Sequence, residues 1–216
     1  LLDRIYRRRV FPRDVVGTEL ANFLCACSHD IGRQVGVLID RRGQIEHVVV
    51  GDAHKLVLPD GGRLRAAVGR FRGLRLVHTH LRGEALTNDD LTDLALLRLD
   101  LVAAIGVTPS GAAGTLYMAH LMPPREGARE PWLRLPPQPT HSVDLDFAEL
   151  MRSLEAEFHR VVDRATKTES GKDRAILVSV VRSGGNKDSA AVRAAHTAAR
   201  VAELGELCRT AGVTVL

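Results

Sequence analysis

The sequence contains few aromatic residues and no long apolar segment. Aromatic residues make up 4% of the 216 residues, which argues against the base-stacking platforms of proteins that bind single-stranded nucleic acid. No apolar run approaches the roughly 18 residues that a membrane-spanning helix needs. We therefore expect no membrane span and a cytoplasmic location.

Motifs for nucleotide binding and for nucleophilic catalysis are missing as well. The glycine-rich segments 171–173 and 184–189 lack the GxxxxGK(S/T) spacing of a phosphate loop, and there is no GxGxxG. No GxSxG elbow is present. The three cysteines, Cys25, Cys27 and Cys208, form no CxxC pair, so we expect reduced thiols rather than disulfides or a thiolate metal site. No cofactor site is predicted from these motifs.

The charge of the chain is weakly positive, with a formal net charge of +4. The excess is arginine, which is concentrated in residues 7–9 and in a cluster of Arg63, Arg65, Arg70, Arg72 and Arg75. Such patches suit phosphate backbones, although a solvated surface is the simpler interpretation. Contact with RNA in a larger assembly is the alternative, and DNA binding is not predicted.

Hydrophobic periodicity predicts an α/β protein in four parts. Residues 1–121 are expected to form an α+β domain of strands and helices. Residues 122–144 hold six of the nine prolines and are expected to form a linker or an extended arm. A connecting helix should cover 145–172, and a parallel strand, helix and strand should begin a second α/β domain in 173–216. Because the chain ends inside this last strand, we expect it to be part of a longer protein.

A hairpin near the N-terminus carries the first candidate site residue. Thr18 should cap a helix that ends before Gly32, and strands at 34–39 and 45–50 should pair across a turn. Glu46 interrupts the otherwise apolar second strand. It is either a general base near the histidines described next or a water-exposed residue on an edge strand.

The segment 73–107 is predicted to form a strand, a loop, a helix and a second strand. His78 and His80 are two residues apart, so they should point to the same face at the end of the first strand. Thr87 and Asp90 have the spacing of a capping box at the start of the helix. In one interpretation they only cap that helix, and in the other His78, His80 and Asp90 bind a catalytic zinc ion.

Two family resemblances can be tied to residues. Residues 175–178, 203–207 and 210–213 resemble the start of the N-terminal domain of the HflX family of GTPases. The histidine strand and the segment that ends at Asp100 are similar to the long N-terminal extension of some HflX proteins. This resemblance implies a cytoplasmic GTP-binding protein that associates with the large ribosomal subunit and its rRNA and acts in ribosome splitting or rescue. GTP and magnesium would bind in a G domain that this chain does not include.

Residues 34–121 resemble the JAMM/MPN metalloprotease fold in its RadC-like bacterial form, which implies a mixed sheet flanked by helices. The matching residues are Glu46, His78, His80, Thr87 and Asp90. The chain departs from the family pattern at Leu81, which replaces a proline, and in a loop before Thr87 that is one residue shorter. The resemblance implies zinc held by the two histidines and Asp90, with Glu46 as general base and the Thr87 hydroxyl near a developing oxyanion. The implied activity is hydrolysis of a peptide or isopeptide bond, unless the site is degenerate.

Overall fold

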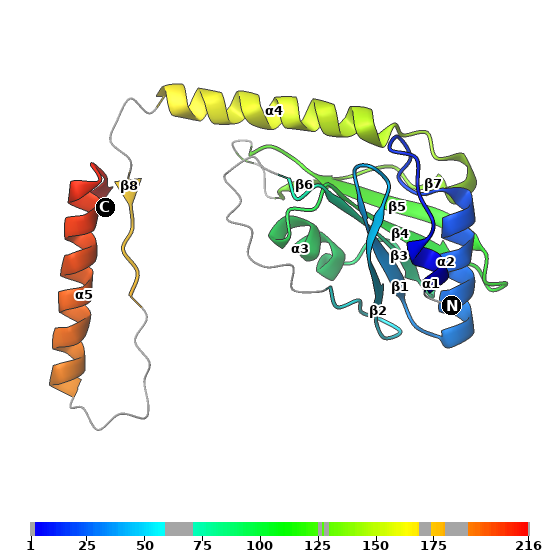
Figure 1. Cartoon of the computed structure of the whole chain (residues 1–216), viewed down its shortest axis with the longest axis horizontal. Helices are drawn as coiled ribbons and strands as arrows, with labels where there is room; N and C mark the ends of the chain where they lie inside the picture. Colours follow the sequence, from blue (N-terminus) through cyan, green and yellow to red (C-terminus); the bar gives the residue numbers. More distant parts are fainter. Residues whose placement is uncertain are drawn as a thin grey trace. The chain divides into compact units, whose positions relative to one another are not determined.

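A mixed seven-stranded sheet forms the centre of the first part of the molecule (Figure 1). The computed structural model describes residues 3–58, 71–124, 127, 130–168, 174–179 and 190–215. These fall into two units, Leu1–Asp163 and Arg164–Leu216. The strands of the first unit are β1 (Val35–Asp40), β2 (Ile45–Val50), β3 (Leu74–His80), β4 (Leu101–Val107), β5 (Ala113–Leu121), β6 (Trp132–Arg134) and β7 (Gln138–Pro139). The predicted α+β fold is confirmed.

The strand order explains why β3 lies at the middle of the sheet. The order is β2-β1-β3-β4-β5-β6, and β7 also pairs with β5. β3 and β4 are parallel because the helix between them carries the chain back to the same end, whereas the other pairs are antiparallel. β4 is buried along its whole length, as its continuous apolar sequence requires.

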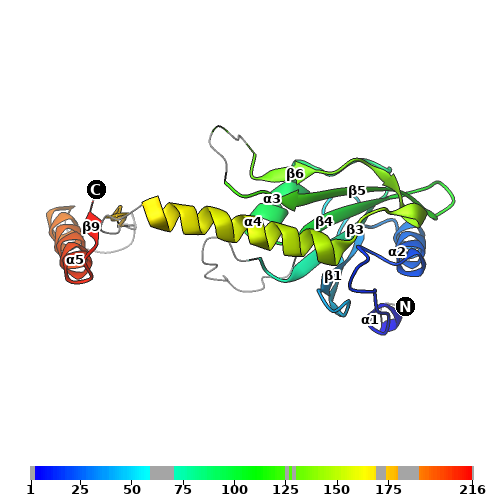
Figure 2. The ribbon, with the colours of Figure 1, turned by 90° about the horizontal axis from the view of Figure 1, so that it is seen from above.

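Helices cover both faces of this sheet (Figure 2). They are α1 (Asp3–Tyr6), α2 (Thr18–Ile31), α3 (Asn88–Leu96), the short 3-10 helix η1 (Thr140–Ser142) and α4 (Phe147–Thr168). α2 and the first turns of α4 pack on one face, and α3 packs on the other with Phe158 of α4. The predicted cap at Thr18 is wrong by one residue, because Gly17 is the N-cap and makes no side-chain cap bond. Gly32 ends α2 in the left-handed conformation that glycine favours.

The proline-rich segment belongs to the sheet rather than forming a free linker. Trp132–Arg134 and Gln138–Pro139 pair with the two ends of β5. Pro139 is tolerated there because β7 is an edge strand that needs few backbone donors. Both short strands therefore belong to the first unit, and the division between the two units comes later, after Asp163.

The predicted basic surface cluster is wrong at Arg75, which is buried. Its side chain is fully buried in β3, where Nε donates to the Val15 carbonyl at 2.9 Å and Nη1 donates to the Asp40 carbonyl at 2.7 Å. The guanidinium lies 4.4 Å from the ring centroid of Phe147, a cation–π contact. Burial lowers the pKa of Arg75 to about 10. Arg63, Arg65 and Arg70, the other cluster members apart from Arg72, lie outside the described residues.

A buried carboxylate joins the hairpin, the start of β4 and helix α4. Arg41 Nε donates to Asp100 at 2.6 Å, and Arg41 Nη1 donates to Glu155 at 2.7 Å. The other carboxylate oxygen of Asp100 accepts from the Gly73 amide at 2.9 Å. Burial raises the pKa of Asp100, and the contact with Arg41 opposes that rise.

The second unit contains the predicted strand, helix and strand. These are β8 (Arg174–Ala175), α5 (Ala190–Thr210) and β9 (Thr214–Val215), and β8 and β9 pair in parallel. Ile176 and Val178 stay exposed after β8, and Leu207 is exposed on α5. Of the helices in the described part of the chain, none combines the length and apolar character that crossing a bilayer demands.

Replacing Arg41 tests the buried carboxylate network. Arg41→Met leaves Asp100 buried without its cation, so we expect the free energy of unfolding to fall by about 2 kcal/mol. The loss is smaller than for a fully buried pair because the side chains of Arg41 and Glu155 are 35% and 39% exposed. Urea denaturation measures this, with Arg42→Met in the same turn as the exposed control. Equal stability of the two variants would contradict the assignment.

Candidate metal centre

Small neighbours make room for the two histidines at the end of β3. His78 and His80 are 0% and 1% exposed and lie on the α3 face of the sheet. Their partners on the parallel strand β4 are Ala104 and Gly106. On the other side His78 pairs with Gly36, where an added Cβ would meet the His78 Cβ at 3.0 Å. The space for both imidazoles is therefore built into the neighbouring strands.

Thr79, between the histidines, points to the opposite face and fixes the strand end. Its hydroxyl accepts from the Val35 amide at 2.9 Å and donates to the Ser28 hydroxyl at 2.8 Å. Ser28 in turn donates to the Arg33 carbonyl at 2.6 Å. β3 is thus tied to both β1 and α2, which holds His78 and His80 in position.

The start of α3 supplies the third group of the site. The Asp90 amide donates to the Thr87 hydroxyl at 3.3 Å, and the Thr87 amide donates to the Asp90 carboxylate at 2.6 Å. This is the predicted capping box. The Thr87 hydroxyl also donates to Asp90 Oδ2 at 2.8 Å. Because that hydroxyl proton already faces a carboxylate, it is not available to a developing oxyanion in this arrangement.

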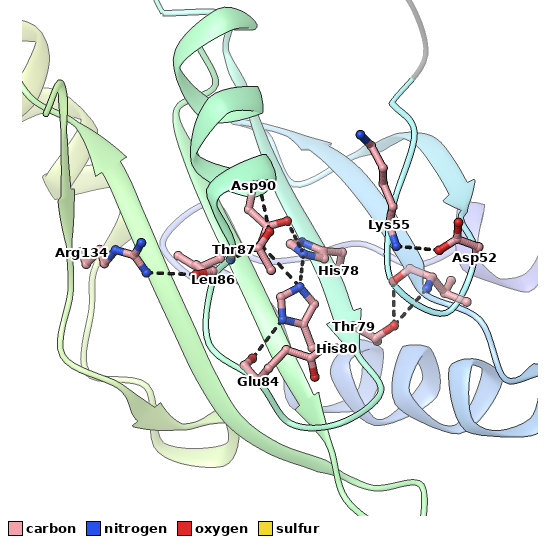
Figure 3. Close-up of polar contacts among 11 residues, drawn as sticks. Asp52, Lys55, His78, Thr79, His80, Glu84, Leu86, Thr87, Asp90 and Arg134 are labelled. Atoms are coloured by element: carbon pink, nitrogen blue, oxygen red, sulfur yellow. Dashed lines mark hydrogen bonds and ion pairs between the residues drawn. The ribbon is translucent and has the colours of Figure 1, made fainter.

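The two histidines and Asp90 converge on one point (Figure 3). His78 Nε2 lies 3.1 Å from Asp90 Oδ1, and His80 Nε2 lies 3.5 Å from Oδ2. The two Nε2 atoms are 2.9 Å apart. One ligand atom from each of the three residues lies within 4.8 Å of the others. The sequence prediction that these three side chains meet is therefore correct.

Hydrogen bonds to the far sides of the rings bear on the tautomers. His80 Nδ1 lies 2.9 Å from the Glu84 carbonyl, which can only accept, so Nδ1 carries the proton and Nε2 presents a lone pair to the site. His78 Nδ1 is buried without a hydrogen-bond partner among the described residues. At most one proton lies between the facing nitrogens, and a carboxylate stands beside them. This is an environment that attracts a cation.

The donor set fits a zinc ion. Two imidazole nitrogens and one carboxylate leave a fourth tetrahedral position for water, which is the composition of a catalytic zinc site. Zinc–nitrogen bonds of about 2.0–2.1 Å at a tetrahedral angle place two nitrogens roughly 3.3 Å apart. The Nε2 atoms of His78 and His80 would need to separate by only about 0.4 Å, a small rotation of either ring.

Electrostatics favour the protonation states in which Asp90 and His80 can bind a metal. Burial opposes the ionisation of Asp90, yet the hydrogen bond and charge of His78, with the bonds from Thr87, hold the pKa of Asp90 well below its usual range. Burial, and then repulsion from His78, lowers the pKa of His80. A carboxylate and a neutral imidazole are the ligand forms of both groups.

Glu46 lies apart from this group. The register passes from Leu38 opposite His47 to Ile39 opposite Ile45, so Glu46 is the extra residue of a β-bulge on an edge strand. Gly36 on β1 pairs with Val49 on β2 and with His78 on β3, so Val49 is the β2 residue level with His78. Glu46 lies three residues from Val49 along β2, and β2 is two strand positions from β3. Strand geometry puts the Cα atoms of Glu46 and His78 roughly 14 Å apart. Glu46 is exposed, and its expected role as general base is not supported.

Sequence reasoning missed three groups around the site. The Glu84 carbonyl orients His80, and no side-chain pattern could reveal a backbone acceptor. Lys55 Nζ lies 3.1 Å from Asp89, next to the cap. Asp93 is half-buried one turn along α3, and burial, followed by the charge of Asp90, raises its pKa. Its spacing of three from Asp90 was the signal that could have identified it.

The buried imidazole of His80 makes stability depend on pH. Its pKa is lowered in the folded state, so below the unfolded value of about 6.5 the unfolded chain takes up a proton that the folded chain refuses. In metal-free buffer we expect the free energy of unfolding to fall as pH drops below about 6.5, by at most about 1.4 kcal/mol per pH unit from this group. His80→Asn should flatten the profile, and the exposed His47→Asn should not. Parallel profiles for the wild type and His80→Asn would refute this.

Comparisons with protein-family models, with curated proteins and with solved structures found no match to the chain. The chemistry of the site therefore follows from its own donor atoms. Those atoms form a buried His-His-Asp group whose composition and spacing suit a divalent cation.

Proposed function

We propose that this chain is the part of an HflX-type GTP-binding protein that lies outside its G domain. The protein would associate with the large ribosomal subunit and act in ribosome splitting or rescue. The supporting observation is the second unit, where residues 203–207 lie in α5 and the short strands β8 and β9 on either side of that helix pair in parallel. GTP and magnesium would bind in the G domain, so no residue of this chain is assigned to them.

Binding to ribosomal subunits tests this proposal. We expect the chain to co-sediment with purified large ribosomal subunits and not with small subunits at the same concentration. Binding should weaken as salt rises, because contacts with rRNA phosphates release counterions. Co-sedimentation with neither subunit, or equally with both, would refute the association. A downstream reading frame without a phosphate loop would refute the HflX assignment itself.

A second proposal concerns the first unit, which we infer to be a zinc-binding domain related in chemistry to metallohydrolases. The observation that favours it is the convergence of His78, His80 and Asp90. When bound, zinc would lower the pKa of a coordinated water toward roughly 7 and so supply a hydroxide nucleophile. The chain's own residues would hold the ion, with the Glu84 carbonyl orienting His80 and Thr87 orienting Asp90.

A complete hydrolase also needs a proton carrier near the metal-bound water. Glu46 is too distant by the geometry above. Asp93 is the carboxylate whose charge interacts with both His78 and Asp90. It is therefore the residue to replace in a test for the proton carrier when a substrate is known. Metal binding therefore has stronger support than hydrolysis of a peptide or isopeptide bond.

Metal analysis of purified variants tests the zinc site. The wild type should hold about one zinc per chain, and His78→Ala should hold almost none, because removal of one of three protein ligands leaves an incomplete site. Zinc should also raise the melting temperature of the wild type but not of the variant. The matched control is His47→Ala, which removes an exposed histidine from the same sheet. A His78→Ala protein with wild-type zinc content would exclude the site.

A further inference from the structure

Arginines surround a hollow at the start of the first unit, away from the histidine site. The hollow has a volume of about 650 Å³, and α1 and α2 lie beside each other there in both views (Figures 1 and 2). Its lining residues include Arg4, Arg7, Arg8, Arg9, Phe11 and the first residues of α2. Four arginines line this one concavity, and such a concentration of positive charge favours anions.

Three of these arginines are available to a ligand. Arg8 is engaged within the fold, because it pairs with Glu19 and lies 4.6 Å from the ring centroid of Phe23. Arg4, Arg7 and Arg9 are exposed, and within the described part of the chain their side chains form no ion pair. The carboxylates of the lining do not cancel them, since Glu19 already pairs with Arg8 and Asp14 lies 3.7 Å from Arg13.

The segment that carries Arg9 and Phe11 is held on the β1–β2 hairpin. The backbone of Arg9 forms an isolated antiparallel β-bridge with Gln44, and the Val10 amide donates to the Gly43 carbonyl at 3.0 Å. Gly43 has a φ of 84°, and an added Cβ would lie 1.7 Å from the Val10 carbonyl oxygen. Only glycine allows this close approach. A ligand would thus meet a preformed surface.

An aromatic ring and a helix terminus complete the hollow. Phe11 is 72% exposed, which is unusual for a phenylalanine and leaves a face free for stacking. The N-cap of the 14-residue helix α2 is Gly17, which makes no side-chain cap bond, and residues 17–20 of this helix terminus line the hollow. Guanidinium groups and one stacking face together match a phosphodiester and its base.

We infer that this hollow binds single-stranded RNA, with Arg4, Arg7 and Arg9 on successive phosphates and one base stacked on Phe11. The low aromatic content of the chain fits one stacked base rather than an extended platform. An anionic membrane surface is less well matched, because it is flat whereas the site is concave. The inference rests on the proposed ribosome association only for the identity of the RNA in the cell.

Fluorescence anisotropy with a labelled RNA of about 12 mixed-sequence nucleotides tests this. We expect R4Q/R7Q/R9Q to weaken binding at least roughly tenfold and to reduce the slope of log affinity against log salt by about 2, for three phosphate contacts. The charge-matched control R152Q/R160Q/R200Q removes exposed arginines elsewhere and should change affinity less than about twofold. F11A should weaken RNA binding roughly tenfold, with the salt slope unchanged.

Several results would overturn the inference. One is the absence of RNA binding by the wild type at about 50 mM salt. Another is an equal loss of RNA affinity in the two triple variants. Binding to phosphatidylserine vesicles that depends on the same arginines, with RNA binding unaffected by their loss, would assign the hollow to membranes instead. Ribosome co-sedimentation separates the RNA site in the hollow from the proposed ribosome association. If R4Q/R7Q/R9Q binds the large subunit and the RNA like the wild type, the RNA site fails and the association stands. If the chain binds RNA but neither subunit, the reverse holds.

Discussion

The contact between Asp90 and the two histidines is the constraint on which the candidate site depends. Asp90 occupies the N3 position of α3, where its carboxylate is fixed by the Thr87 amide. The same carboxylate faces His78 Nε2 at 3.1 Å. One side chain therefore caps a helix and completes a group of three side chains that could hold a metal ion. A capping box alone needs no buried imidazoles, and a strand end alone needs no carboxylate, so their meeting indicates a purpose beyond helix formation.

The surrounding fold supports that contact from several directions. Thr79 anchors the end of β3 to α2 and β1, and the small residues Gly36 and Gly106 leave space beside the imidazoles. Farther along the same strand, Arg75 joins backbone carbonyls from two other segments beneath Phe147. Each of these partners is distant in the sequence. The geometry of the site is therefore a property of the whole first unit.

Local rules predicted the parts of the site that depend on local geometry. The two-residue period of a strand gave the shared face of His78 and His80, and the capping spacing gave the position of Asp90. The predicted role of Glu46 as a general base is not supported, because a bulge and the strand order separate it from the histidines. Neither feature follows from the alternation of side chains along a strand. The surface position predicted for Arg75 is wrong, because the carbonyl groups that accept hydrogen bonds from its buried guanidinium come from segments distant in the sequence. The prolines of 122–144 suggested a linker, but an edge strand accommodates them.

The most direct test of the convergence of His78, His80 and Asp90 is zinc X-ray absorption on the loaded protein. We predict two imidazole ligands with the remaining scatterers oxygen, all at about 2.0–2.2 Å. A sulfur shell at about 2.3 Å, or a single imidazole, would contradict it, because the ion would then sit elsewhere on the chain.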